Sequence, residues 1–578
     1  MFLSKKSLAI AALTTASLAC TAYAPAQTVS FNSAGSSAQW QTFALAASLL
    51  ANKTGYTVHH YTIKGKAADG SPYAGIADSR TSGGVTPPVE AGNLWVVWNE
   101  VGSNGTPVNV WAFSSVDSVV GLRTFFAVPR AKLVLDPSIT TTKSAQLISA
   151  TLPDWATEDE FLPQSVYNVL NDLPLTAANT DIRPEDGLFA YNRIVATLNP
   201  TTRAGLGYGP GPIGTGIQSH YSTTVATPVA FSLTGADPIS GEAHPSGGYT
   251  TIPVGATPIV FVVNKTNASG LGKPGLGHDL SVTEAAGNVA YTIFGGKSCI
   301  FNGVTVNPVL REPLSGTMNT AEFTNFRLTA SPSGSQEANI NPTLANNNPL
   351  NLTCLNGAGV RTRAVGTGES INNGVLPTAD AIGYAFWGFG NFSKLAASTS
   401  YGYLTLDGVD PIAASYTNGE LPACPASGCP VAGGTSFPNL RNGTYRSWSL
   451  LRVVTDSATT NPTNYNNTVA LVAAANKLIN KTVPDFVPFL ASCATTGANE
   501  PGLDVYREHF TPTGITVTPN DGSVPTTVDC SAHSGAPAQT LVGRTLGGGT
   551  EAGGDVGGKI QGPFTANPPT PGPTGTRQ

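Results

Sequence analysis

Arg311 stands four residues before the tripeptide Ser315-Gly316-Thr317 in the segment LREPLSGTMNTAEF, residues 310–323. A guanidinium can make a bidentate contact to a phosphate-like oxyanion. Glycine lets the backbone approach a ligand closely, and hydroxyl and N–H groups at a helix start supply further donors. The pattern therefore predicts anion capture. The alternative is an ordinary Ser/Thr helix cap with the arginine on the surface.

Two other segments carry residue types that suit an anion. Gly35-Ser36-Ser37 lies between an expected strand and an expected helix, where backbone N–H groups point at the loop. Asp181 follows Thr180 and could accept a proton from HPO₄²⁻ or H₂PO₄⁻, whereas ionised sulfate offers none. Such a side chain would select the ligand by penalising the wrong one. Both segments are also compatible with a plain helix cap.

Several catalytic and cofactor patterns are incomplete. The run GGKS at 295–298 ends like a P-loop, but the first glycine of that motif would fall at Tyr291. The chain has no His-Glu-x-x-His and no Gly-x-Ser-x-Gly. His59 and His60 are neighbours in a strand pattern, so their rings should point to opposite faces. We therefore expect no catalytic residue, no metal and no cofactor.

The elements that must position these side chains follow from the hydrophobic periodicity. We expect strands at 29–31, 57–63, 94–101, 108–116 and 257–264, and a strand or loop at 378–392. Helices are expected at 38–50, 280–296 and 468–480, and after a turn within 180–198. The two strands around Gly102-Ser103-Asn104-Gly105 suit a hairpin. Strands that alternate with helices predict an α/β fold with a largely parallel sheet.

Composition and the N-terminus indicate an exported protein. The 578 residues are 40% hydrophobic and 11% charged, so the chain can bury a core, and a net charge of −5 argues against a general nucleic-acid binder. Lys5 and Lys6, the apolar run 8–19 and Ala22-Tyr23-Ala24 predict a signal peptide at 1–24. Cys20 offers a lipoprotein alternative. We expect a periplasmic or secreted protein whose mature chain does not span a membrane.

Six cysteines remain after residue 24, and an even number in an exported chain suggests disulfides. CPASGCP would close a small local loop. The expected pairs are Cys424–Cys429 and, by proximity along the chain, Cys299–Cys354 and Cys493–Cys530. A metal site is the competing interpretation, but no Cys-x-x-Cys and no paired histidine lies nearby.

Taken in order, these segments resemble the phosphate-binding proteins of bacterial ABC importers, members of the type 2 periplasmic-binding superfamily. The segments that carry the resemblance are NSAGSSAQWQTF, TDIRPEDGLFA, TPIVFVVN, YTIFGGKS, REPLSGT with Phe323 soon after it, and AIGYAFWGF. Their collinear order extends over about residues 29 to 490. The chain departs from the family in a long insertion before Asp181, where we assign no counterpart to the usual Ser/Gly-rich second loop.

The resemblance implies a two-lobed α/β fold, each lobe a mostly parallel sheet flanked by helices, with extra β-rich insertions. Lobe 1 would comprise residues 25–264 and 401–510 with an insertion at about 65–170, and lobe 2 would comprise 265–400. Residues 511–578 would form a C-terminal extension with a flexible Gly/Pro-rich tail from about 547. One anion would lie in the cleft between the lobes.

By the same resemblance, seven residues would bind that anion. They are Ser36 and Ser37 from the first loop, Asp181 as acceptor of the ligand's proton, Arg311 as its counter-charge, and Ser315, Gly316 and Thr317 as donors. The expected function is capture of phosphate or a similar oxyanion for uptake or sensing, without catalysis. The expected partners are that anion and a membrane ABC importer, with no nucleic acid, and we expect a monomer.

Two other functions compete with this expectation. One is a structural or interaction protein on the same scaffold with no anion bound. The other is a secreted hydrolase, which the absence of a visible nucleophile–base pair disfavours.

Overall fold

The computed structural model places most of the chain between residues 28 and 488. It describes residues 28–81, 84, 86–87, 89–102, 106–148, 155, 157–184, 186–188, 230–265, 279–280, 289–312, 314–321, 325–326, 353–364, 366–388, 392, 400–412, 437–441, 445, 447–478, 486–488, 505–506, 540–541, 543–546 and 549–552. The expected signal peptide and Cys20 lie outside these ranges. Within them, no helix has both the length and the apolar character that crossing a bilayer requires.

One large mixed sheet organises the described residues. Its strand order is β15-β14-β16-β10-β18-β9-β1-β6-β5-β2, with β11, β17 and β19 off this path. The strands are β1 (Thr28–Gly35), β2 (Tyr56–Ile63), β5 (Asn93–Val101), β6 (Pro107–Ser115), β9 (Ala177–Thr180), β10 (Tyr249–Asn264), β11 (Asp279–Leu280), β14 (Asn307–Arg311), β15 (Thr362–Ala364), β16 (Ala381–Phe386), β17 (Tyr401–Leu406), β18 (Trp448–Asp456) and β19 (Val487–Pro488). The expected strands and the expected hairpin, now β5 and β6, are confirmed.

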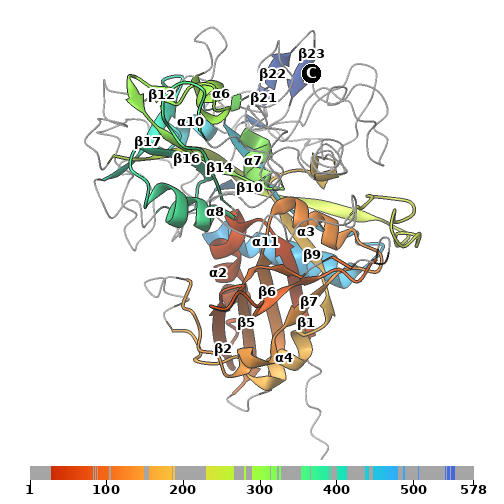
Figure 1. Cartoon of the computed structure of the whole chain (residues 1–578). Helices are drawn as coiled ribbons and strands as arrows, with labels where there is room; N and C mark the ends of the chain where they lie inside the picture. The colour runs from red at the N-terminus through yellow and green to blue at the C-terminus, as the bar shows by residue number, and fades with distance from the viewer. Residues whose placement is uncertain are drawn as a thin grey trace, which may run out of the picture.

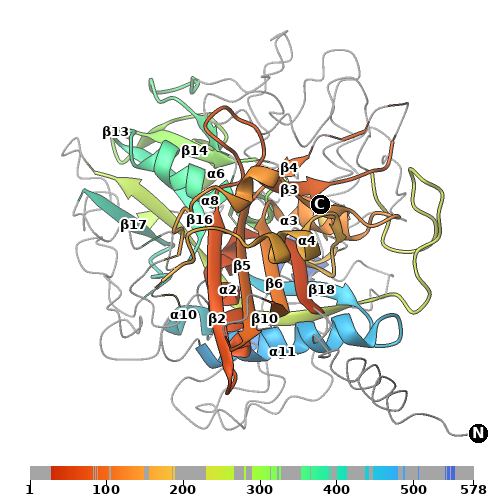
Figure 2. The same cartoon turned by 90° about the horizontal axis from the view of Figure 1, so that it is seen from below.

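Helices cover this sheet, so the predicted α/β class is confirmed. They are η1 (Ser37–Gln39), α2 (Trp40–Ala51), α3 (Ser118–Phe125), η2 (Pro137–Thr140), α4 (Gln164–Leu170), α6 (Val289–Phe294), α7 (Gly316–Ala321), α8 (Gly366–Glu369), the π-helix η7 (Ser370–Val375), α10 (Pro438–Arg441) and α11 (Pro462–Leu478). The Ser36 side chain accepts a hydrogen bond from the Ala38 N–H at 3.1 Å and so caps the turn that leads into α2. Helices α2 and α11 pack on each other, and Figure 2 shows α11 running along β10 and β18.

Strand β10 joins two halves of the molecule. Its first part, Tyr249–Pro258, pairs with β18, and its last part, Ile259–Asn264, pairs with β16 and β17. Figure 1 shows β14, β16 and β17 in one half and β1, β2, β5 and β6 in the other, with β10 between them. Residues of both halves are buried in one continuous apolar cluster. The lobe boundaries expected from the sequence remain a prediction.

A small antiparallel sheet lies within the segment 65–174. Its order is β4-β3-β7-β8, formed by β4 (Glu90–Ala91), β3 (Ala74–Ala77), β7 (Lys132–Leu135) and β8 (Leu173–Pro174). Its apolar side chains share a core with those of β2, β5 and β6. Strands β5 and β6 themselves belong to the large sheet, because β6 pairs with β1.

The disulfide between Cys299 and Cys354 is present, with the two Cα atoms 5.8 Å apart, so that expected pair is confirmed. It ties the hairpin β12 (Ile300–Phe301) and β13 (Val304–Thr305) to the turn that precedes β15. Cys424, Cys429, Cys493 and Cys530 lie outside the described residues. Near the C-terminus the described strands are β20 (Val505–Tyr506), paired with β21 (Thr540–Leu541), and β22 (Gly543–Leu546), paired with β23 (Gly549–Ala552).

Candidate functional site

Three neighbouring parallel strands end at the same edge of the large sheet. Strand β1 lies between β9 and β6 and runs parallel to both. Polar side chains follow each strand closely: Ser36 after β1, Asp117 and Ser118 after β6, and Asp181 after β9. Ligands of open α/β sheets commonly bind beyond the carboxyl ends of such strands. The topology therefore brings these four side chains together, although they are up to 145 residues apart in sequence.

Ser36 and Asp181 are in direct contact. The Ser36 hydroxyl donates a hydrogen bond to Asp181 Oδ1, and the Ser36 N–H donates to the Asn179 carbonyl at 2.9 Å. The Asp181 N–H donates to the Ser118 hydroxyl oxygen at 3.2 Å. All three side chains are buried, with Ser36 and Asp181 each 3% exposed. One hydroxyl and one carboxylate of the expected set thus form a single cluster, which Ser118 completes.

A second pair of parallel strands contributes from the other half of the molecule. Strand β14 ends at Arg311 and pairs in parallel with β15, after which α8 carries Thr367. Arg311 Nη1 donates to Thr367 Oγ1 at 3.0 Å and to Thr317 Oγ1 at 3.4 Å. The Ser37 hydroxyl donates to the same Thr367 oxygen at 3.4 Å. Thr367 therefore joins the first loop to the arginine.

The guanidinium of Arg311 is also paired with two carboxylates. Its Nε and Nη2 donate to Glu312 at 3.1 and 2.9 Å, and Nη2 lies 3.4 Å from Asp117 Oδ1. Glu312 accepts further hydrogen bonds, at 3.3 Å, from the Gly366 N–H. Arg311 is 2% exposed, so its charge is compensated inside the protein rather than by water.

Gly316 joins the two halves by close packing. A Cβ atom built at this position would lie 2.5 Å from the Ser118 hydroxyl and 2.8 Å from Asp181 Oδ2. Only glycine leaves room for these groups. The Ser-Gly-Thr tripeptide thus packs directly against the side chains that follow β6 and β9.

Burial sets the protonation of the carboxyl groups in this cluster. It raises the pKa of Asp181 to about 6, although hydrogen bonds from Ser36 and Ser118 and the Arg311 charge act to lower it. Burial also raises the pKa of Glu312 against the opposing Arg311 charge, and the neighbouring Asp117 adds to that rise. The cluster can therefore take up protons at mildly acidic pH.

Of the residues expected to bind the anion, Ser36, Asp181, Arg311, Gly316 and Thr317 converge here. Ser37 reaches the cluster through Thr367. The Ser315 hydroxyl accepts from the Met318 N–H at 3.2 Å, which is the bond of a helix cap on α7. Their role in binding remains a prediction.

Sequence reasoning missed Asp117, Ser118, Glu312 and Thr367. The polar run that follows the apolar strand VNVWAFSS was a usable signal for the first two, because hydroxyls after a buried strand also singled out Ser36. The missing information was that β6 lies beside β1. Glu312 is next to Arg311 in sequence, whereas Thr367 lies 56 residues from it and no local pattern connects the two.

The histidines of β2 have separate partners, as their alternation predicted. His59 Nδ1 lies 3.0 Å from Asp159, and its ring stacks on Trp98. His60 Nε2 lies 2.8 Å from the Ser48 hydroxyl, and burial lowers the pKa of His60 to about 4. Ser48 and His60 are 3% and 9% exposed, so this pair contributes to packing. No cluster of metal-ligating side chains occurs among the described residues.

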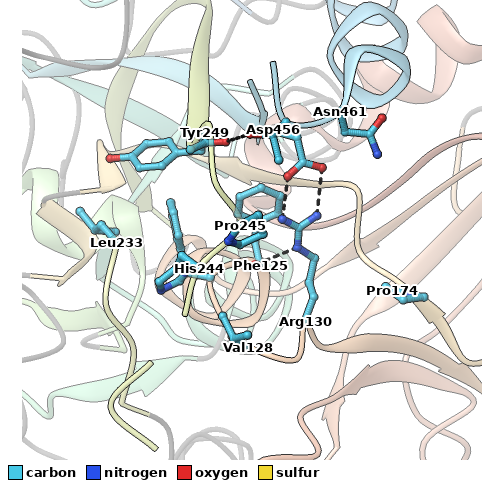
Figure 3. Close-up of a pocket in the computed structure, with 14 residues that line it drawn as sticks. Phe125, Val128, Arg130, Pro174, Leu233, His244, Pro245, Tyr249, Asp456 and Asn461 are labelled. Atoms are coloured by element: carbon cyan, nitrogen blue, oxygen red, sulfur yellow. Dashed lines mark hydrogen bonds and ion pairs between the residues drawn. The ribbon is translucent and has the colours of Figure 1, made fainter. Parts of the chain in front are cut away.

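A separate pocket of about 300 Å³ opens at the C-terminal end of α3 (Figure 3). The Arg130 guanidinium lies over the Phe125 ring, 4.1 Å from its centroid, and donates to Asp456 at 2.8 and 3.2 Å. Figure 3 shows this pair beside Tyr249 and His244. Burial lowers the pKa of His244. Asp456 offsets the positive charge, and the pocket is not lined by any of the residues expected to bind the anion.

Solved structures to which parts of this chain are similar include phosphate-binding proteins. The phosphate-binding protein from Stenotrophomonas maltophilia shares 15% identity over 66% of this chain and 86% of its own length, with a TM-score of 0.27. An ABC-type phosphate transport receptor from Vibrio cholerae shares 16% identity over 43% of this chain and 75% of its own, with a TM-score of 0.23. This chain spans 65% of a Clostridium perfringens chain described as a candidate phosphate transporter substrate-binding protein.

These likenesses are distant and partial. No family model and no curated relative matches this chain. Because the identities and TM-scores are low, the ligands of these proteins do not transfer to it.

Proposed function

We propose that this chain is an exported, non-enzymatic solute-binding protein that captures phosphate or a similar oxyanion for uptake or sensing. One observation carries the proposal. Side chains that follow β1, β6 and β9 meet side chains that follow β14 and β15 in one buried cluster. The cluster contains a guanidinium, several hydroxyls and a glycine at a close approach, which are the groups that recognise an oxyanion.

Asp181 gives this site a means of choosing its anion. A carboxylate beside the ligand accepts a hydrogen bond from a protonated phosphate oxygen, whereas sulfate presents only lone pairs to it. With sulfate, the buried Asp181 carboxylate would face a sulfate oxygen without a hydrogen bond between them, and this would cost much of the binding free energy. Since the pKa of Asp181 is raised only to about 6, the group is mostly ionised at neutral pH and able to accept.

The burial of the cluster implies that the two halves separate before an anion can bind. Ser36, Asp181 and Arg311 are at most 3% exposed in this conformation, and Gly316 is buried. Hinge motion between two lobes is the usual way in which such sites open and close. Closure would exclude water and strengthen each charged contact.

Calorimetric titration of residues 25–578 with phosphate, and separately with sulfate, tests the proposal. Phosphate binding should exceed sulfate binding. Arg311→Ala should weaken phosphate binding by at least about tenfold, because a hydrogen bond to a charged group is worth about 1.5–3 kcal/mol. Arg130→Ala, which breaks a different arginine–carboxylate pair, is the matched control and should bind normally. If the wild-type protein binds neither phosphate nor sulfate in these titrations, the anion-binding function is refuted.

A structural or interaction role has one observation in its favour. Glu312, Asp117, Thr317 and Thr367 already surround the Arg311 guanidinium. A protein that never binds an anion would satisfy a buried arginine in the same way. The same titration separates the two functions.

A further inference from the structure

The cluster around Arg311 contains more acidic than basic side chains. Asp117 and Glu312 contact the guanidinium, Asp181 interacts with its charge, and each of the three is at most 6% exposed. Among the described residues, further titratable groups at this arginine are Tyr384, whose hydroxyl oxygen accepts from the Arg311 N–H at 3.3 Å, and Arg363, which donates to the Arg311 carbonyl at 3.3 Å. An incoming anion would therefore meet carboxylates as well as donors.

The two carboxylates that contact the guanidinium are held differently. Glu312 follows Arg311 directly after the end of β14, makes two hydrogen bonds to it and accepts from the Gly366 N–H. Asp117 comes from the other half of the molecule, at the start of α3. Its carboxylate lies 3.4 Å from Nη2 and is also hydrogen-bonded to the Glu312 side chain. Its side chain does not cap α3. Glu312 thus orients the arginine, whereas Asp117 approaches from the side of Ser118 and Asp181.

We propose that the Asp117 carboxylate is an internal anion that competes with the ligand for Arg311, so that an oxyanion binds together with a proton. This inference rests on the proposed function of the site. The proton comes from solvent and neutralises the carboxyl cluster when the ligand's charge arrives. Asp117 is then a specificity residue, since it disfavours fully ionised ligands more strongly than ligands that bring a proton.

The electrostatics of the neighbours agree with this role. The negative charge of Asp117 contributes to raising the pKa of both Glu312 and Asp181, after the larger effect of their burial. As pH falls, these groups take up protons and the negative charge that faces an incoming anion decreases. By linkage, an anion that binds must in turn favour protonation.

The test compares wild type with Asp117→Asn by calorimetric titration with sulfate and with phosphate, between about pH 5.5 and about pH 8. Sulfate carries no proton in this range, so its pH dependence reports the protein alone. Repeating each titration in two buffers of different ionisation enthalpy counts the protons taken up. Asp172→Asn, at an exposed ion pair with Lys132, is the matched control.

We expect the wild-type affinity for sulfate to rise as pH falls, by up to about tenfold per pH unit for each proton taken up. Asp117→Asn should bind both anions at least about tenfold more tightly at pH 8, with fewer protons taken up. Asp117→Ser, which removes the carboxyl group and shortens the side chain, should do the same and serves if the amide variant misfolds. Both variants are checked by thermal melting.

Two results would overturn the inference in distinguishable ways. If wild type binds phosphate but both Asp117 variants bind no tighter and take up the same number of protons, Asp117 does not compete and the proposed function stands. If wild type and both variants bind neither anion at any pH, the proposed function fails and this inference fails with it.

Discussion

Two buried ionic clusters, one at Arg311 and one at Arg80, both pair arginine with carboxyl groups. They shift the pKa of an aspartate in opposite directions. In the second, Arg80 pairs with Asp78 and Asp237, both at 2.6 Å. Asp237 also accepts backbone hydrogen bonds from Ile239 and Ser240 at 2.9 Å. Burial acts to raise the pKa of Asp237, but these bonds and the Arg80 charge outweigh it, so the pKa is lowered.

The backbone hydrogen bonds to carboxyl groups in the Arg311 cluster are longer, since Glu312 accepts from the Gly366 N–H at 3.3 Å. Asp181 is hydrogen-bonded by the side chains of Ser36 and Ser118, but burial dominates and raises its pKa. The Arg80 cluster thus holds together the segments that carry Asp78 and Asp237. The Arg311 cluster contains carboxyl groups that a bound ligand or a proton can still stabilise. Perturbed carboxyl groups of this kind are candidates for function.

The largest expected difference between the clusters is in the pH dependence of stability. For Asp181, whose folded-state pKa is raised from 3.8 to about 6, the free energy of unfolding should fall as pH rises through that interval. Asp181→Asn removes the ionisable group and should stabilise the protein above about pH 7 by up to about 3 kcal/mol, with no gain at about pH 4. Urea denaturation across this range measures both values.

Asp237→Asn should behave in the opposite way. Because the folded-state pKa of Asp237 is lowered, its stabilisation is present at neutral pH and is lost as pH falls below its ordinary value. The variant should therefore be destabilised at neutral pH and approach wild type in acid. Equal signs for the two variants would contradict the comparison.

A smaller effect on stability is expected from adding a methyl group at Gly316, where the backbone lies close to Ser118 and Asp181. Gly316→Ala would place a methyl group against Ser118 and Asp181 and should cost about 1–3 kcal/mol of stability, with weaker phosphate binding. Gly368→Ala on α8 is the control, because its Cβ would meet only the Asn372 side chain, at 3.9 Å. Equal stability and equal phosphate affinity of the two variants would show that the close packing of Gly316 against Ser118 and Asp181 contributes to neither.

The sequence predicted the local parts of this fold better than their assembly. The strand at 257–264 and the helix at 468–480 follow from apolar periodicity alone, and both are present as β10 and α11. Ser36 could be singled out because hydroxyls between an expected strand and an expected helix are a local signal, and Asp181 because it follows Thr180 at a turn before an expected helix. The neighbouring positions of β6, β1 and β9 are not local, so Asp117 and Ser118 were missed.

The contacts of Arg311 show the same limit. The spacing to Ser315-Gly316-Thr317 suggested a positive charge at an anion site, but it did not show which carboxylates share that charge. Glu312 adjoins Arg311, yet its bidentate bond depends on the turn after β14. Asp117 reaches the guanidinium from 194 residues away.

The most direct test of the central claim is phosphate titration of Arg311→Lys and Arg80→Lys beside wild type. Both variants keep the charge but lose the planar fork of the guanidinium. If the Arg311 cluster binds the anion and the Arg80 cluster only supports the fold, Arg311→Lys should weaken phosphate binding by at least about tenfold, and Arg80→Lys should leave it unchanged in the folded protein. Equal affinities in the two variants, whether both reduced or both intact, would contradict the account.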